Sequence, residues 1–118
     1  MTNKTQVYLI GSDISKFEYD IYCSKKIKSL SERNVNLNAI FARNFEELPV
    51  VKKYCLKHKI ETIDLEKDEK NYFVDVVRYN LDNPDKKNLA VLVSEKRVKA
   101  LRLNFFFKQD PCFNPHLI

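Results

Sequence analysis

Glycine is scarce in this sequence, and its scarcity excludes two common nucleotide-binding motifs. Only one glycine, Gly11, occurs in the 118 residues. The dinucleotide-binding pattern G-x-G-x-x-G and the P-loop each need more than one glycine, so neither motif is present. The chain also lacks any apolar run near the roughly 18 residues that a membrane-spanning helix requires. We therefore expect no membrane span and no secretory signal.

Cysteine is also scarce, and its spacing excludes further classes of site. The three cysteines, Cys23, Cys55 and Cys112, are odd in number and far apart, with no C-x-x-C pair. This pattern gives no zinc-ligand spacing and no disulfide framework, so a redox or metal role is the less favoured reading. It is typical of a reducing compartment, so we expect a cytoplasmic protein in which Cys23 and Cys55 pack on helix faces.

The composition is that of an ordinary globular protein with a basic excess. Apolar residues make up 44% and charged residues 31%, and the length suits one domain spanning residues 1–118. Lys and Arg outnumber Asp and Glu by 21 to 16, which gives a net charge of +5. This charge favours anionic partners such as nucleotides, phosphosugars or nucleic acid, and it does not choose among them. A nucleic-acid partner is less favoured, because the basic residues are spread along the chain.

The most apolar short run, Leu89–Val93, predicts the centre of the fold. A run of this length that is rich in β-branched residues is typical of a strand buried on both faces of a parallel sheet. Further strand patterns occur at 6–10, 35–41, 62–65 and 112–114, and helical spacing follows Ser15, Asn44, Asn71 and Ser94. This alternation predicts an α/β, Rossmann-like three-layer fold with a mainly parallel sheet of four to five strands.

Local signals predict where the helices begin and end. Ser15 and Glu18 have the spacing of a capping box, and Asn34 is a suitable helix end. Asn44 and Glu47 form a second candidate cap, followed by Pro49 within the first helical turn. A fourth helix after Ser94 would carry a basic row that we expect to be solvated: Lys96, Arg97, Lys99 and Arg102.

Ligands of open α/β sheets bind beyond the carboxyl ends of the strands. The loops to consider there include Ala42–Asn44 and the segment after Asp64. From the ends of the first and fourth strands, we predict ligand-binding roles for Gly11, Ser12, Asp13 and Ser94.

Near the end of the sequence, Asn114 and His116 suggest a catalytic pair. Alternate positions on a strand point the same way, so both side chains would face one cleft. An amide can stabilise an oxyanion, and an imidazole can move a proton. The segment Cys112-Phe-Asn-Pro-His-Leu-Ile118 resembles the N-terminal half of the folate-dependent formyltransferases, whose motif places Asn and His two positions apart after a short strand.

This resemblance implies an activity and a cofactor. The reaction would be formyl transfer from 10-formyltetrahydrofolate to an amine, with no metal. Asn114 would stabilise the oxyanion and His116 would assist proton transfer. The later catalytic Asp and the folate loop of that family have no counterpart in these residues. The resemblance therefore implies that a second chain, a homo-oligomer or a further segment completes the site.

Two alternatives belong to other functional classes. The carboxylates of Asp13, Asp64, Asp75 and Glu95 could meet at the strand ends and hold Mg²⁺, as in two-metal phosphoryl chemistry. The segments 73–76 and 91–95 are similar to the pattern of PIN- and NYN-type nucleases, although Lys96 would oppose a metal. The other alternative is a non-catalytic binding or regulatory module.

The tail gives one more prediction. We expect Phe113 to be buried on the sheet face opposite Asn114 and His116, and the residues after His116 to be frayed.

Overall fold

The computed structural model describes residues 4–12, 16–65, 72–94 and 113–118. These residues form five strands, three α-helices and one short 3-10 helix. In chain order the elements are β1 (Thr5–Ser12), α1 (Lys16–Glu32), β2 (Ala39–Ala42), η1 (Phe45–Glu47), α2 (Pro49–Lys57), β3 (Glu61–Asp64), α3 (Tyr72–Asp82), β4 (Asn88–Ser94) and β5 (Phe113–Leu117).

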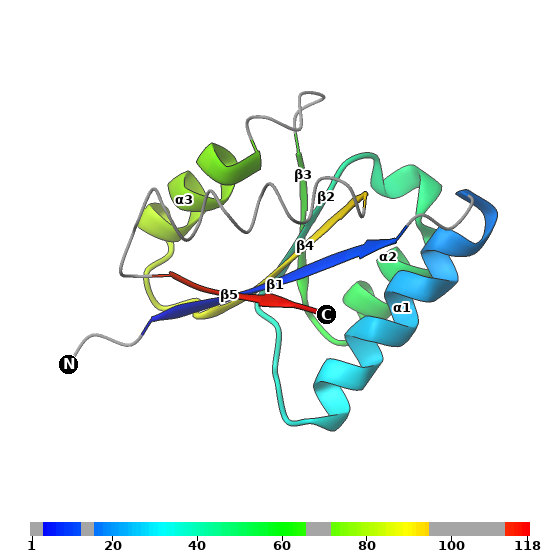
Figure 1. Cartoon of the computed structure of the whole chain (residues 1–118), viewed down its shortest axis with the longest axis horizontal. Helices are drawn as coiled ribbons and strands as arrows, with labels where there is room; N and C mark the ends of the chain where they lie inside the picture. Colours follow the sequence, from blue (N-terminus) through cyan, green and yellow to red (C-terminus); the bar gives the residue numbers. More distant parts are fainter. Residues whose placement is uncertain (1–3, 13–15, 66–71, 95–112) are drawn as a thin grey trace.

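The strands form one sheet in the order β3-β2-β4-β1-β5, and every neighbouring pair is parallel. Helices α1 and α2 cover one face of this sheet and α3 covers the other (Figure 1). The α/β, Rossmann-like three-layer fold is thus confirmed. β4, which contains the apolar run 89–93, is the central strand, as predicted.

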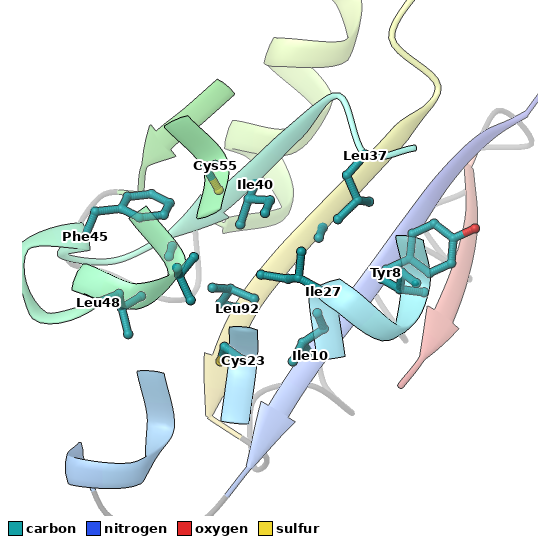
Figure 2. Packing of buried hydrophobic residues seen from close by; sticks show 14 residues of the cluster. Tyr8, Ile10, Cys23, Ile27, Leu37, Ile40, Phe45, Leu48, Cys55 and Leu92 are labelled. Atoms are coloured by element: carbon teal, nitrogen blue, oxygen red, sulfur yellow. The ribbon is translucent and has the colours of Figure 1, made fainter. Parts of the chain in front are cut away.

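Burial on both faces explains the composition of β4. Leu89, Val91 and Val93 pack into the core beneath α3. Ala90 and Leu92 pack into the core beneath α1 and α2, where Figure 2 shows Leu92 among the apolar side chains of the helices. A strand with no solvated face has no place for polar side chains, so its sequence is a continuous apolar run.

The second strand is shorter than the alternating pattern over 35–41 predicted. β2 contains only Ala39–Ala42, and all four residues are buried. It lies between β3 and β4 and is covered on both faces, so its two sides carry the same kind of residue. Val35 instead lies just after α1, and its backbone N–H donates to the Leu30 carbonyl in the last turn of that helix.

Left-handed backbone positions are filled without glycine. Asn34, Asn44 and Lys59 have φ values of 64°, 59° and 58°. Asparagine tolerates this region, and Asn34 ends α1 as predicted. The single glycine does not serve a turn, because Gly11 lies inside β1 and pairs with Val93.

Helix α2 is capped by a side chain from another helix. The carboxylate of Asp20, on α1, accepts the backbone N–H groups of Val50 and Val51 at 2.8 and 2.9 Å. The predicted cap at Asn44 is wrong, since Asn44 makes no side-chain capping bond and α2 begins later, at Pro49. Pro49 does lie in the first turn, as predicted. Asp20 is 7% exposed, and its role as a cap explains why a carboxylate is buried there.

The tail is ordered into a strand that is longer than predicted. β5 reaches Leu117, and the Ile118 N–H donates to the Leu9 carbonyl at 3.2 Å. The prediction of a frayed end after His116 is therefore wrong, because β1 offers a free edge with which these residues pair. Phe113 is 5% exposed and packs with Val7 and Leu9, on the face opposite His116, as predicted.

Several predicted features lie outside the described residues: the cap at Ser15, the basic row at 96–102 and Cys112. Among the helices that the structure describes, none has the length and apolarity needed to cross a bilayer.

Candidate functional site

Strand connectivity places the topological switch point of the sheet between the carboxyl ends of β2 and β4. β2 and β4 are neighbours, but β2 connects toward β3 at one edge while β4 connects toward β5 at the other. Where the connections of adjacent strands diverge in this way, a crevice opens beyond the strand ends and is the usual ligand site of open α/β sheets. The residues that follow β2 and end β4 therefore define the candidate site.

Among the described residues, Arg43 is a charged residue that directly follows a strand at this switch point. It follows Ala42, the last residue of β2, which pairs with Leu92 of β4. The Arg43 side chain is exposed, and within the described part of the chain it has no ion pair or hydrogen-bond partner. A guanidinium presents several donors in a planar fork that matches phosphate or carboxylate oxygens. Arg43 is thus suited to bind an anion at the strand ends.

The neighbouring strand ends contribute three of the four predicted ligand-binding residues. Ser12 pairs with Ser94, and Gly11 pairs with Val93, so β1 and β4 end side by side. The structure thus brings Gly11, Ser12 and Ser94 to one edge, next to the end of β2. Asp13 lies outside the described residues.

Two tyrosines of α1 fix the helix over this edge. The Tyr19 hydroxyl donates to the Val93 carbonyl at 2.9 Å, and the Tyr22 hydroxyl donates to the Gly11 carbonyl at 3.3 Å. Carbonyl groups at strand ends often lose their ladder partners, and these hydroxyls satisfy two of them. These two hydrogen bonds therefore hold α1 against the ends of β1 and β4.

Asn114 and His116 come together, but at another part of the sheet. Asn114 pairs with Gln6 and His116 pairs with Tyr8. Along β1, these positions lie roughly 20 and 13 Å from Ser12, at about 3.3 Å per residue. The structure therefore does not bring the predicted catalytic pair to the predicted ligand-binding residues.

The contacts of this pair are local. Asn114 Nδ2 donates to Gln6 Oε1 at 3.0 Å, and His116 Nε2 lies 2.6 Å from the same oxygen. The His116 ring also stacks on Tyr8 with ring centroids 4.8 Å apart. Because a carbonyl oxygen only accepts, the 2.6 Å contact is a hydrogen bond in the tautomer that carries its proton on Nε2. These contacts fasten β5 to β1.

Burial lowers the pKa of His116 below its ordinary value of 6.5, because the charged imidazolium loses water. The unfolded chain then takes up the proton more readily than the folded chain. Stability supplied by this group is therefore complete above about pH 6.5 and is lost as the pH falls through the folded pKa.

We expect the free energy of unfolding to decrease between about pH 7 and about pH 5, and His116→Gln to reduce that decrease. Urea unfolding at the two pH values measures this decrease in the wild type and in the variant. His58→Gln is the matched control, since His58 is an exposed histidine outside β5. Equal pH dependence in wild type and His116→Gln would contradict the burial argument.

The acidic residues of the alternative nuclease hypothesis are only partly described. Asp64 ends β3 and is exposed, whereas Asp75 lies in the first turn of α3 with its Oδ2 buried and unbonded. Asp13 and Glu95 lie outside the described residues. Within the ranges that the structure describes, no three His, Cys, Asp or Glu residues gather as metal ligands.

The cysteines of the core are unreactive. Cys23 and Cys55 are buried under the α1 and α2 layer, as predicted (Figure 2). Burial raises the pKa of Cys23 to about 12 and that of Cys55 to about 11. Both thiols therefore stay protonated at neutral pH, and they serve packing rather than nucleophilic chemistry.

Arg43 was not among the residues assigned to the site from the sequence. Its loop, Ala42–Asn44, was a candidate region, but only the order of the strands shows that the end of β2 borders the crevice. Comparisons of this chain with models of protein families, with curated proteins and with solved structures found no match.

Proposed function

We propose that this domain binds an anionic small molecule in the crevice at the carboxyl ends of β2 and β4, with Arg43 as the charged ligand-binding residue. The observation that carries the proposal is the exposed, unpaired guanidinium of Arg43 at the point where the strand connections diverge. A net charge of +5 attracts anions to the same molecule. Nucleotides, phosphosugars and folates are the ligand classes that fit this chemistry.

The nearby start of α2 does not compete for the anion. Helix N-termini often bind anions through their free N–H groups. In α2, however, the Val50 and Val51 N–H groups already donate to the Asp20 carboxylate. That carboxylate also repels a second negative charge, so the positive charge of Arg43 determines where the ligand binds.

The proposal predicts thermal stabilisation by an anion. Ligand at 100 times its Kd should stabilise the folded state by about 2.7 kcal/mol. Melting the protein with inorganic phosphate, nucleoside monophosphates, a sugar phosphate and 10-formyltetrahydrofolate would identify the class. We expect Arg43→Ala to lose the stabilisation, because no other described side chain at the crevice supplies a positive charge.

Arg78→Ala is the matched control, because Arg78 is an exposed arginine on α3, on the other face of the sheet. Stabilisation that survives in Arg43→Ala would contradict the proposed site. Stabilisation by Mn²⁺ that disappears in Asp75→Asn would favour the metal-dependent nuclease instead. If no anion changes the melting temperature, a non-catalytic module with another partner becomes the better hypothesis.

Formyl transfer is a second, more specific proposal. It is supported by the close approach of Asn114 and His116 to one oxygen and by the burial that lowers the pKa of His116 and so favours the neutral imidazole. Their distance from Arg43 means that a second chain or segment must help to form a complete site. Stabilisation by 10-formyltetrahydrofolate that Asn114→Ala abolishes is the expected result, and unchanged stabilisation in that variant would contradict it.

A further inference from the structure

A second hollow lies at the opposite end of the molecule, between the last turns of α1 and α2. Its volume is about 120 Å³, and it shares the lining residues Ser31, Tyr54 and His58 with a neighbouring depression of about 550 Å³. About 10 to 15 Å³ of such volume holds one water molecule, so the inner hollow has room for a group of several heavy atoms. Ile27 and Leu37 are buried at its base, while Ser31 and Asn36 are exposed at its mouth.

Aromatic side chains form one wall of this hollow. The rings of Tyr54 and His58 pack together with centroids 4.2 Å apart and an angle of 31° between their planes. His58 is exposed, so its ring also has surface available to a ligand. A planar ring bordering a hollow is the arrangement on which unpaired nucleobases stack.

The surrounding surface holds the positive charge of the described chain. Residues 18–59, which include α2 and all but the first two residues of α1, carry nine basic and five acidic side chains, a net charge of +4. The remaining described segments, excluding Lys16, carry four basic and five acidic side chains, a net charge of −1. Within the described residues, the net positive charge therefore belongs to the segment that contains α1 and α2.

Charge at the hollow itself is also positive, despite the two helix ends. Each helix C-terminus contributes about −0.5 elementary charge, and Glu32 adds −1. Lys28 and Lys57 line the depression, and Arg33 and Lys59 lie next to its lining residues in sequence. These four cations exceed the negative charges by about 2, so the depression attracts an anion.

We infer that this basic face binds single-stranded nucleic acid, with a base in the hollow against His58 and phosphates on Lys28 and Lys57. A polymer suits the surface better than a single anion does, because the lysines continue along both helices beyond the hollow. A single strand suits it better than a duplex does, because only an unpaired base can leave its stack and enter the hollow. This inference does not depend on the crevice at Arg43.

Fluorescence anisotropy of labelled oligothymidine and oligouridine tests the inference. We expect binding that weakens steeply between about 50 and 200 mM salt. The double variant Lys28→Glu/Lys57→Glu should weaken binding by about tenfold or more and lower the salt slope by about 1.4, the value for two lost phosphate contacts on a single strand. His58→Ala should weaken binding by about 5- to 150-fold, as the loss of one stacked base does, and leave the salt slope unchanged.

Arg78→Glu/Lys87→Glu is the matched control, with the same charge change on the α3 side of the molecule. It should bind nearly as wild type does, and all variants should keep the wild-type melting temperature within a few degrees because they change no buried side chain. No binding at low salt, or equal loss in the control, would overturn the inference. Adenosine monophosphate that competes as well as the oligonucleotide does, at equal phosphate concentration, would also overturn it. Binding to anionic vesicles without binding to the oligonucleotide would overturn it too.

Discussion

Val91→Asp is expected to unfold most of the protein at room temperature. Val91 has no exposed surface and lies in β4, paired with Leu9 of β1 and Phe41 of β2. The substitution loses the burial of an apolar side chain, roughly 1.5 to 3 kcal/mol, and places a carboxylate where no described side chain can pair with it. A total cost above about 5 kcal/mol would remove most of the stability of a domain of this size.

Circular dichroism during thermal and urea unfolding measures this effect. Val74→Asp is the matched control, because Val74 is a valine on α3 with 46% of its surface exposed. The control should melt within a few degrees of wild type, while Val91→Asp should show no cooperative transition or a much lower midpoint. Equal midpoints for the two variants would show that β4 is not the centre of the core.

The elements that were predicted well are those whose own sequence contains the signal. The run 89–93 and the helical spacing after Asn71 need no information from other segments, and both are observed. The end of α1 at Asn34 also follows from a local preference, because asparagine tolerates the left-handed region. Hydrophobic periodicity and the residue preferences of helix ends depend on only a few neighbouring residues, so they can be recognised in a single sequence.

Features that depend on distant partners were missed. The short extent of β2 follows from its neighbours β3 and β4, and the order of β5 follows from the free edge of β1. The position of the candidate site also depends on the order of the strands. Whether Arg43 borders a crevice depends on the insertion of β4 between β2 and β1, and no local pattern around Arg43 contains that information.

The Asn114 and His116 pair illustrates the difference between direction and position. Alternation along a strand correctly predicts that the two side chains point to the same side, since both contact Gln6 Oε1. It does not predict the register of β5 on β1, which determines how far from the strand ends they lie. A motif of two residues therefore predicts that their side chains point to the same side of the sheet. Where along the sheet they lie depends on which residues of the neighbouring strand they pair with.

Asp20 is the clearest case of a residue whose role only the fold reveals. In sequence it is an acidic residue amid aromatic and apolar neighbours, with no sign of a partner. In the structure its two carboxylate oxygens receive the Val50 and Val51 N–H groups, which α2 cannot satisfy itself because its own N-cap residue, Leu48, has no polar side chain. The carboxylate also lies at the positive end of the α2 dipole, which adds to its stabilising effect.

Asp20→Ala is therefore expected to destabilise the protein by about 3 kcal/mol, since hydrogen bonds to a charged group contribute about 1.5 to 3 kcal/mol and the Val51 N–H would be left buried. At roughly 3 to 6 °C per kcal/mol for a chain of this length, the melting temperature should fall by about 9 to 18 °C. Asp20→Asn, which keeps one acceptor oxygen, should lose about half as much.

Glu18→Ala, an exposed acid on the same helix, is the control and should cost at most about 1 kcal/mol. If Asp20→Ala and Glu18→Ala melt together, the bonds from Asp20 to α2 do not stabilise the fold, and the helix must be held by the packing of Val51 and Cys55 alone.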